Sequence, residues 1–134
     1  MSWKWVRTVS VSGWVLLGIV GCGGSDGPAR YELSGSVTYR GQPVTAGHIL
    51  FAPDHTQQNN GPGTHAEIEN GRYQTLTGQG TIGGPHVVSI SGSDGKPYDM
   101  GRQINPMGRP LFADYKVSID LPRETATHDF VVPD

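Results

Sequence analysis

The stretch from Tyr31 to Tyr39 alternates strictly between two kinds of residue. The odd positions hold Tyr, Leu, Gly, Val and Tyr, whereas the even positions hold Glu, Ser, Ser and Thr. Successive side chains of a β-strand point to opposite faces of the sheet, so a period of two places one set in the core and the other in water. The pattern therefore predicts a half-buried antiparallel strand at 31–39.

The same alternation recurs along the chain and predicts seven short strands. They are expected at 31–39, 47–53, 65–69, around Tyr73, around Val88 and Ile90, at 115–121 and at 128–132. Further side chains expected to face inward are Ile49, Phe51, Ala66, Ile68, Tyr115, Val117, Ile119, Leu121, Phe130 and Val132. Asn70-Gly71 predicts a tight hairpin, because both central residues of a type I′ turn need a positive φ.

Seven strands separated by Gly, Pro and Asn turns, with no amphipathic helical period after residue 30, predict an all-β domain. The expected architecture is a two-sheet sandwich or a small barrel. The cysteine pair and core tryptophan of immunoglobulin domains are missing, since the only cysteine is Cys22 and the tryptophans are Trp3, Trp5 and Trp14. The core must therefore be built from Val, Ile, Leu, Phe and Tyr.

The N-terminal segment has the order of a secretory leader. Lys4 and Arg7 precede an apolar stretch at about 8–20, and small Gly21 stands directly before Cys22. A retained transmembrane helix is the alternative, but it needs about 20 apolar residues, and this run is shorter and diluted by Thr, Ser and Gly.

The four residues 19–22, Ile-Val-Gly-Cys, resemble the bacterial lipobox. The resemblance implies that the Cys22 sulfur is lipidated and that a peptidase cuts between Gly21 and Cys22. The chain then divides into a signal peptide at 1–21, a flexible Gly-rich tether at 22–29 and one folded domain at 30–134. Two or more acyl chains hold a protein stably on a membrane. The expected location is therefore the cell envelope, with the outer membrane favoured because Gly23, not Asp, follows the cysteine.

Charge and composition exclude several classes of protein. Without residues 1–21 the chain has 113 residues, with eight Lys and Arg against twelve Asp and Glu, a formal charge of −4. A scattered acidic excess argues against nucleic-acid binding, which needs a basic patch. Because the single thiol is assigned to lipid, no disulfide is expected and stability must come from sheet hydrogen bonds and packing.

Several segments resemble small lipoproteins of planctomycete-type bacteria that carry a carboxypeptidase regulatory-like, or transthyretin-like, domain. The segments are Gly-Ser-Val-Thr-Tyr-Arg-Gly-Gln-Pro-Val at 35–44, Gly-His-Ile-Leu-Phe-Ala-Pro at 47–53, Ala-Glu-Ile-Glu-Asn-Gly-Arg-Tyr at 66–73, Gly-Pro-His-Val-Val-Ser-Ile at 84–90, 110–115 and 128–132. The resemblance implies a seven-stranded antiparallel, Ig-like (prealbumin-like) Greek-key sandwich without an assigned reaction. These motifs are mostly turn glycines and strand alternation, so they bear on fold and location more than on activity.

No motif predicts catalysis, a metal or a cofactor. The five histidines, His48, His55, His65, His86 and His128, have no metal-ligand spacing and are expected to be ordinary surface residues. Transthyretin-like hydrolases of hydroxyisourate use strand histidines but end in Tyr-Arg-Gly-Ser, which this C-terminus lacks. No Gly-x-Ser-x-Gly motif opens a helix. The expectation is therefore a protein that is not an enzyme.

Two connections, 54–64 and 92–108, are longer than strands usually require. The second is the better candidate for a binding site, because Tyr98 with Arg102 could stack on and hydrogen-bond a sugar or peptide, with Lys96 nearby. A solvated, disordered loop is the alternative. Asp94-Gly95 is expected to form a turn, since one carboxylate supplies too few oxygens for calcium.

These observations predict a lipid-anchored envelope protein whose β-sandwich is a non-catalytic structural or interaction module. The alternatives are a carbohydrate- or peptide-binding module that uses 92–108, and a small transthyretin-like hydrolase. The expected partners are the membrane, through the lipid, and a glycan or envelope protein. Neither a ligand nor an oligomeric state is specified by the sequence.

Overall fold

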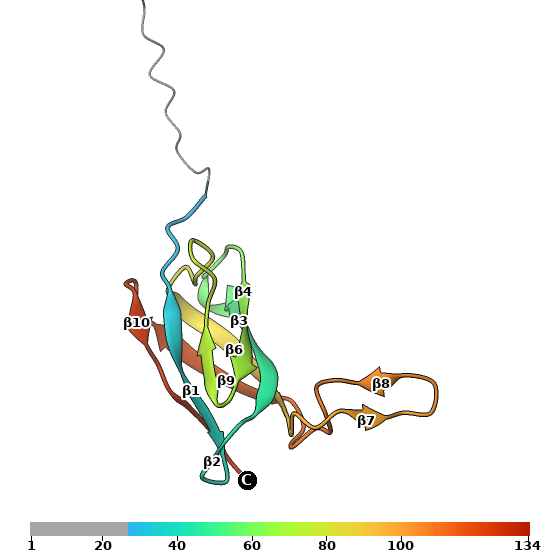
Figure 1. The fold of residues 1–134 in the computed structure, drawn as a ribbon. Helices are drawn as coiled ribbons and strands as arrows, with labels where there is room; N and C mark the ends of the chain where they lie inside the picture. The colour runs from blue at the N-terminus through green and yellow to red at the C-terminus, as the bar shows by residue number, and fades with distance from the viewer. Residues whose placement is uncertain (1–26) are drawn as a thin grey trace, which may run out of the picture.

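The computed structural model describes residues 27–134, which form an all-β body, as expected (Figure 1). The signal peptide, Gly21, Cys22 and the tether up to residue 26 lie outside the described residues. Within 27–134 the only helix is the short 3-10 turn η1, His55–Gln57, and no helix has the length and hydropathy needed to cross a bilayer.

All seven expected strands are present, and four two-residue strands add to them. In chain order they are β1 Leu33–Tyr39, β2 Gln42–Pro43, β3 Ala46–Pro53, β4 Thr64–Glu69, β5 Arg72–Gln74, β6 Gly84–Ser93, β7 Tyr98–Asp99, β8 Ile104–Asn105, β9 Tyr115–Leu121, β10 Ala126–Thr127 and β11 Phe130–Val132. The turn between β4 and β5 has φ values of 50° at Asn70 and 77° at Gly71, as its sequence predicts.

Hydrogen bonding joins nine of these strands into one curled sheet. Its order is β10-β1-β5-β4-β3-β6-β9, with β2 and β11 also paired to β1. The longest ladders join β3 to β6 and β6 to β9, whereas β4 and β5 share only the pairs Ile68 with Tyr73 and Glu69 with Arg72. Beyond Ile68 the sheet opens, because β4 continues along β3 and β5 continues along β1.

The C-terminal strands differ from the expected antiparallel arrangement, because β10 and β11 both run parallel to β1. The path of the chain explains the difference. The end of β9 at Leu121 pairs with Gly84, close to the Tyr31–Thr81 bridge where β1 begins. The last segment therefore starts at the same end of the body as β1 and runs beside it in the same direction.

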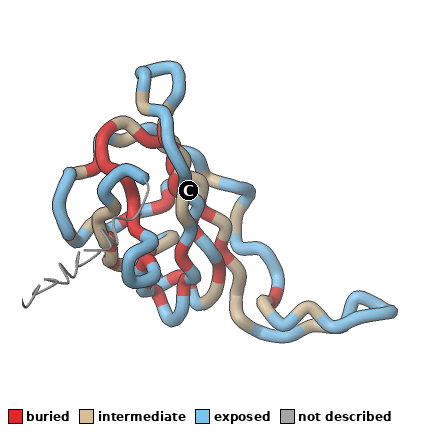
Figure 2. The backbone as a smooth tube through the Cα atoms, turned by 90° about the horizontal axis from the view of Figure 1, so that it is seen from above, coloured by how far each residue is buried: buried red, intermediate tan, exposed pale blue. Residues whose placement is uncertain are grey.

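The concave side of the curled sheet encloses the core. Figure 2 shows most buried residues within the body and most exposed residues along the loops and the projecting arm. Every inward-facing residue expected on the third to fifth strands is buried, and Phe51, Tyr73 and Phe130 form an aromatic cluster with ring centroids 5.8–6.3 Å apart. The expected inward residues of β9 are only half-buried, except for Leu121, because β9 is the edge strand of the sheet.

His86 contradicts the expectation of surface histidines, since only 1% of it is exposed. It lies on β6, where alternation places it on the same face as Val88 and Ile90. Its Nδ1 lies 2.9 Å from the Gly84 carbonyl, so Nδ1 donates and Nε2 carries the lone pair. Nε2 is buried without a hydrogen-bond partner.

Candidate functional site

The segment 96–109, which we call the arm, is an ordered hairpin that projects from the body (Figure 1). Its strands β7 and β8 pair antiparallel, Tyr98 with Asn105 and Asp99 with Ile104. The structure therefore has a paired hairpin in this segment rather than the disordered loop of the alternative interpretation. The arm leaves from the end of β6 beside Tyr39, the last residue of β1, whereas the chain enters the body at the first residues of β1. Entry point and arm thus lie at opposite ends of the body.

Short polar side chains fold the arm locally. Asp99 accepts a hydrogen bond from the Gly101 N–H at 2.7 Å, and Asn105 accepts one from the Met107 N–H at 3.0 Å. Asp and Asn favour such bonds to the backbone two residues on, which mimic a turn. These local bonds bend the chain at both strand ends although the pairing itself is only two residues long.

Asp94 fixes the base of the arm to the body. One of its carboxylate oxygens accepts hydrogen bonds from the N–H groups of Lys96 at 2.9 Å and Arg109 at 3.1 Å, the two ends of the arm. The hydrogen bond from the Lys96 N–H is the main reason that the pKa of Asp94 lies below its usual 3.8. The Arg109 N–H and the positive charges of Lys96 and Arg109 lower this pKa further, whereas burial has a smaller opposing effect. Asp94, expected to form a turn, thus holds the two ends of the arm together through its side chain.

The three residues expected to bind a ligand all lie on the arm, at its base, on β7 and in the turn that follows. Lys96 lines a hollow of about 490 Å³ at the base of the arm, together with Tyr39 and Arg40. Tyr98 lies on β7, and Arg102 lies exposed in the turn between β7 and β8. The guanidinium over the Tyr98 ring belongs to Arg109, 5.0 Å from the ring centroid. This cation–π contact was not indicated by sequence spacing. The expectation that Tyr98 and Arg102 bind a sugar or peptide stays a prediction.

The arm differs from the body in charge and in exposed apolar surface. It has three cationic residues and one carboxylate, a formal charge of +2, whereas the rest of 27–134 has five cationic and ten acidic residues, a charge of −5. Met100 and Ile104 are 54% and 67% exposed. An isolated two-stranded hairpin is marginally stable in water, and these two side chains leave apolar surface of the arm exposed to solvent.

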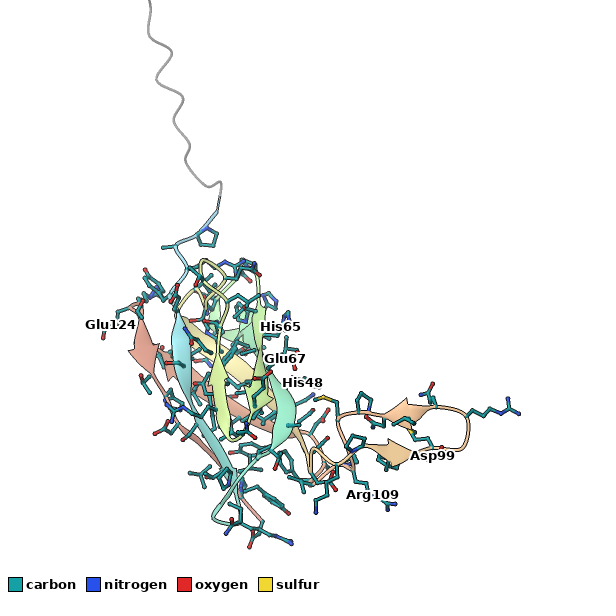
Figure 3. All side chains as sticks on the ribbon, in the orientation of Figure 1. His48, His65, Glu67, Asp99, Arg109 and Glu124 are labelled. Carbon is teal, nitrogen blue, oxygen red and sulfur yellow. The ribbon has the colours of Figure 1, made fainter. Side chains whose placement is uncertain are left out.

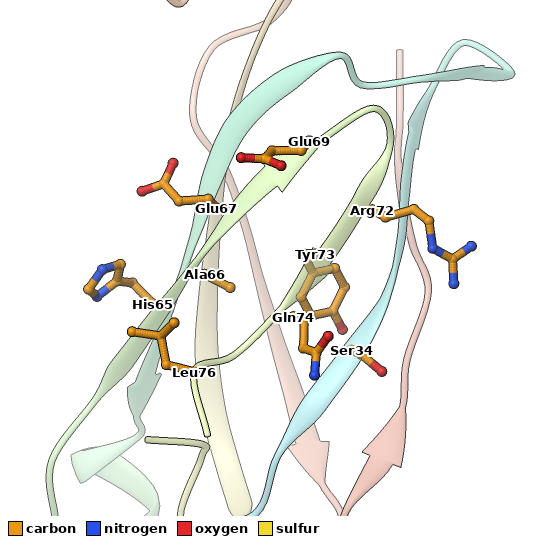
Figure 4. Close-up of a pocket in the computed structure, with 9 residues that line it drawn as sticks. All are labelled: Ser34, His65, Ala66, Glu67, Glu69, Arg72, Tyr73, Gln74 and Leu76. Atoms are coloured by element: carbon orange, nitrogen blue, oxygen red, sulfur yellow. The ribbon is translucent and has the colours of Figure 1, made fainter. Parts of the chain in front are cut away.

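A second surface, which we call the seam groove, lies where β4 and β5 diverge (Figure 4). It has a volume of about 560 Å³, within the usual range for ligand sites. Its lining residues are Ser34, His65, Ala66, Glu67, Glu69, Arg72, Tyr73, Gln74 and Leu76. In Figure 4 the carboxylates of Glu67 and Glu69 lie on the same side of β4, and Arg72 points away from them.

The histidines do not assemble into a metal site. His48 and His65 lie with Glu67 on the outer side of β3 and β4, where His48 is directly opposite Glu67 (Figure 3). Among the residues that the structure describes, no group of three or more His, Cys, Asp or Glu side chains could hold a metal ion.

Sequence patterns did not indicate the seam groove, because alternation gives the face of each residue but not its neighbouring strand. Leu76 is the one residue whose position in the sequence points to the groove. Alternation with the buried Tyr73 and Thr75 places Leu76 on the outer face, although it is apolar. Arg109 lies just outside the long connection at 92–108, so the length of that connection does not point to it.

Comparisons with protein-family models, curated proteins and solved structures gave no match to this chain.

Proposed function

We propose that this protein is a lipid-anchored component of the cell envelope whose β-domain is a non-catalytic interaction module that contacts its partner through the arm. The observation that carries the proposal is the position of the arm, with exposed Met100 and Ile104, at the end of the body opposite the entry of the chain. A lipid on Cys22 would hold the entry end toward a membrane, preferably the outer membrane. The arm would then point away from that membrane.

The body fits the role of a rigid support, and we propose that it is a variant of the prealbumin-like Greek-key sandwich of the carboxypeptidase regulatory-like lipoproteins. In support, β9, β6, β3 and β4 form one set of strands and β5, β1, β10 and β11 another, joined between β4 and β5 by only two residue pairs. Such a narrow junction is compatible with two packed layers around one core.

The proposed lipid anchor is tested by the Cys22→Ala variant in cells that process lipoproteins. Wild-type protein should fractionate with the envelope and gain the mass of a diacylglyceryl group on a chain that starts at Cys22. Cys22→Ala should lose both properties. An unacylated wild-type thiol with the leader still attached would contradict the anchor.

The proposed contact between the arm and a partner is tested with a photo-crosslinking amino acid at position 104 on the arm. The same amino acid at exposed Glu124, after the end of β9, is the matched control. We expect a discrete crosslinked species in the envelope from position 104 alone, and its loss when Met100→Ser removes neighbouring apolar surface. Equal or absent crosslinking at both positions would contradict a role for the arm.

A second candidate is carbohydrate or peptide binding by the arm, favoured by the Tyr98 ring with Arg109 on one face. Rings of this kind stack on planar or apolar ligand surfaces. Glycan-array and pull-down profiles that stay unchanged in Tyr98→Ala with Arg102→Ala would exclude it. For the hydrolase alternative the geometry offers no specific support.

A further inference from the structure

β9 is the last strand of the curled sheet, and its main-chain groups alternate between β6 and the outer edge. The Pro85 carbonyl accepts the Asp54 N–H on the β3 side of β6, so alternation turns the main-chain groups of His86 toward β9. Ile119 lies opposite His86 and therefore faces β6. The next residue, Ser118, directs its N–H and C=O groups away from the sheet.

The outer edge of β9 is open along the length of the strand. By the same alternation, Lys116 and Asp120 face this edge together with Ser118, and all three residues are exposed. In the part of the chain that the structure describes, no strand or loop pairs with them on that side. Proteins usually protect such an edge with a short strand, a Pro or a bulge, but β9 has seven residues and no Pro.

The inner face of β9 is incompletely covered as well. Tyr115, Val117 and Ile119 pack against the core but are only half-buried. On β6, the next strand inward, Val88 and Ile90 point to the same face and are fully buried. A strand added beside β9 would cover the three half-buried side chains in the way that β9 covers those of β6.

The charges on the outer face of β9 match a second copy of β9 in one antiparallel register. When Ser118 lies opposite Ser118 of the second copy, Lys116 of each copy lies opposite Asp120 of the other. Opposite charges that face each other across antiparallel strands stabilise the pairing. In this register every N–H and C=O group that these residues present to the edge also finds a partner.

Neighbouring registers lack this match. A shift that centres the pairing on Val117 places Asp114 opposite Asp120 of the other copy, and the same shift in the other direction brings in Pro122, which has no N–H. Centring the pairing on Lys116 or on Asp120 brings two like charges face to face, which opposes pairing. The sequence of β9 therefore favours the register centred on Ser118.

We propose that two copies of this chain associate edge to edge through β9, with Ser118 at the two-fold axis and Lys116 of each copy beside Asp120 of the other. In a two-fold interface the same surface serves both copies, so a self-complementary strand is sufficient. This association uses a different surface from the arm and does not depend on it.

The interface is a single strand from each copy, so we expect a weak dimer. Its dissociation constant in solution should be about 100 µM. The chain is then monomeric at the low micromolar concentrations of a melting experiment. Attachment of both copies to one membrane would raise their effective concentration and favour the dimer.

The register is tested by disulfide formation in the full chain with Cys22→Ser in detergent, where an introduced cysteine is the only thiol. Ser118→Cys should form a disulfide-linked dimer under mild oxidation, because the Cα atoms of a hydrogen-bonded pair are about 5.5 Å apart. Lys116→Cys and Asp120→Cys are the matched controls. In each, the two thiols are displaced by about 13 Å along the strands and should stay reduced, whereas a mixture of the two variants should crosslink.

Charge reversal tests the pairing of Lys116 with Asp120. Added to Ser118→Cys, either Lys116→Asp or Asp120→Lys places like charges opposite each other at both ends of the interface. Each should slow disulfide formation at least about tenfold. Lys116→Asp together with Asp120→Lys exchanges the two charges and should restore the rate. Both positions are exposed, so the variants are expected to fold.

Three results would each overturn the proposal: no disulfide from Ser118→Cys in a folded chain, equal crosslinking of Ser118→Cys and its two controls, or a double charge reversal that crosslinks as slowly as either single one. Met100→Ser with Ile104→Ser should leave the rate of disulfide formation unchanged. Failure of the β9 contact is therefore distinguishable from failure of the arm.

Discussion

The phenol of Tyr73 on β5 donates a hydrogen bond to the main-chain carbonyl of His128, with 2.6 Å between the oxygens. The bond joins residues 55 positions apart and connects β5 to the segment between β10 and β11, on the opposite side of β1. Burial, followed by the charge of Asp129, raises the pKa of the Tyr73 hydroxyl above its usual 10, so it stays a donor throughout the physiological range. Tyr73 therefore fastens the C-terminal strands to the core.

Replacing Tyr73 by Phe should remove this bond while keeping the ring in the Phe51 and Phe130 cluster. We expect the free energy of unfolding to fall by about 1–1.5 kcal/mol, the usual net contribution of a buried hydrogen bond. Urea denaturation measures the change. Tyr115→Phe is the control, because Tyr115 is half-buried on edge strand β9, and it should change stability by less than half as much. Equal effects would show that the Tyr73 bond contributes nothing specific.

A second prediction concerns Gly35, where β1 passes close to the C-terminal segment. A Cβ at this position would collide with the carbonyl of His128. Gly35→Ala should therefore push β1 and the C-terminal segment apart and destabilise the domain by about 3 kcal/mol, the upper range for overpacking. Thermal unfolding provides the measurement.

Gly41→Ala separates steric contact from the conformational freedom of glycine. Gly41 has a φ of 72°, and a Cβ added there would meet no atom within 4 Å, so the substitution should cost only the strain of a positive φ, about 1 kcal/mol. Similar losses for both variants would mean that the close approach at Gly35 is relieved at little cost.

A third prediction is an acid dependence of stability that arises from Asp129. Its carboxylate accepts a 2.9 Å hydrogen bond from the Ser36 N–H, and this bond, with smaller effects of Arg72 and His128, holds the pKa of Asp129 below its usual 3.8. A lowered pKa means that the ionised form stabilises the fold above the unfolded-state pKa. That contribution disappears as the pH falls through the folded-state pKa.

Melting temperatures of wild type and Asp129→Ala should therefore differ at pH 6 and converge as the pH falls below about 4. Asp120→Ala, on the exposed side of β9, is the control and should follow the wild type across the range. A difference that persists at low pH would show that Asp129 acts through packing rather than through its charge.

A fourth prediction concerns the clamp at the base of the arm. Asp94→Ala removes the acceptor shared by the Lys96 and Arg109 N–H groups, and the arm should open without unfolding the body. Limited trypsin digestion should then cut faster after Arg102, while the melting temperature changes little. Asp99→Ala, which loses one bond at the tip of the arm, should accelerate cleavage less. Unchanged digestion of Asp94→Ala would contradict the clamp.

Local pattern was sufficient to predict the seven longer strands but not the four two-residue strands. Alternation identified β1 and β9 to within two residues, and the Asn70-Gly71 pair specified its turn, because these features depend on each residue's own backbone and on which face it presents. The same reasoning failed at His86, since alternation put it on the inner face but its polarity suggested water. The arm was recognised as an unusually long connection, yet neither its hairpin nor Arg109 over Tyr98 could be read from spacing.

The sequence by itself determined the all-β character, the positions of the strands and most of the core, because the period of two and the turn residues act over a few neighbouring positions. Only the tertiary structure decided which strands pair, that β10 and β11 run parallel to β1, and that β4 and β5 share only two residue pairs. These outcomes depend on contacts between residues far apart in the chain, such as Tyr73 with His128. The alternation within one segment does not specify such contacts.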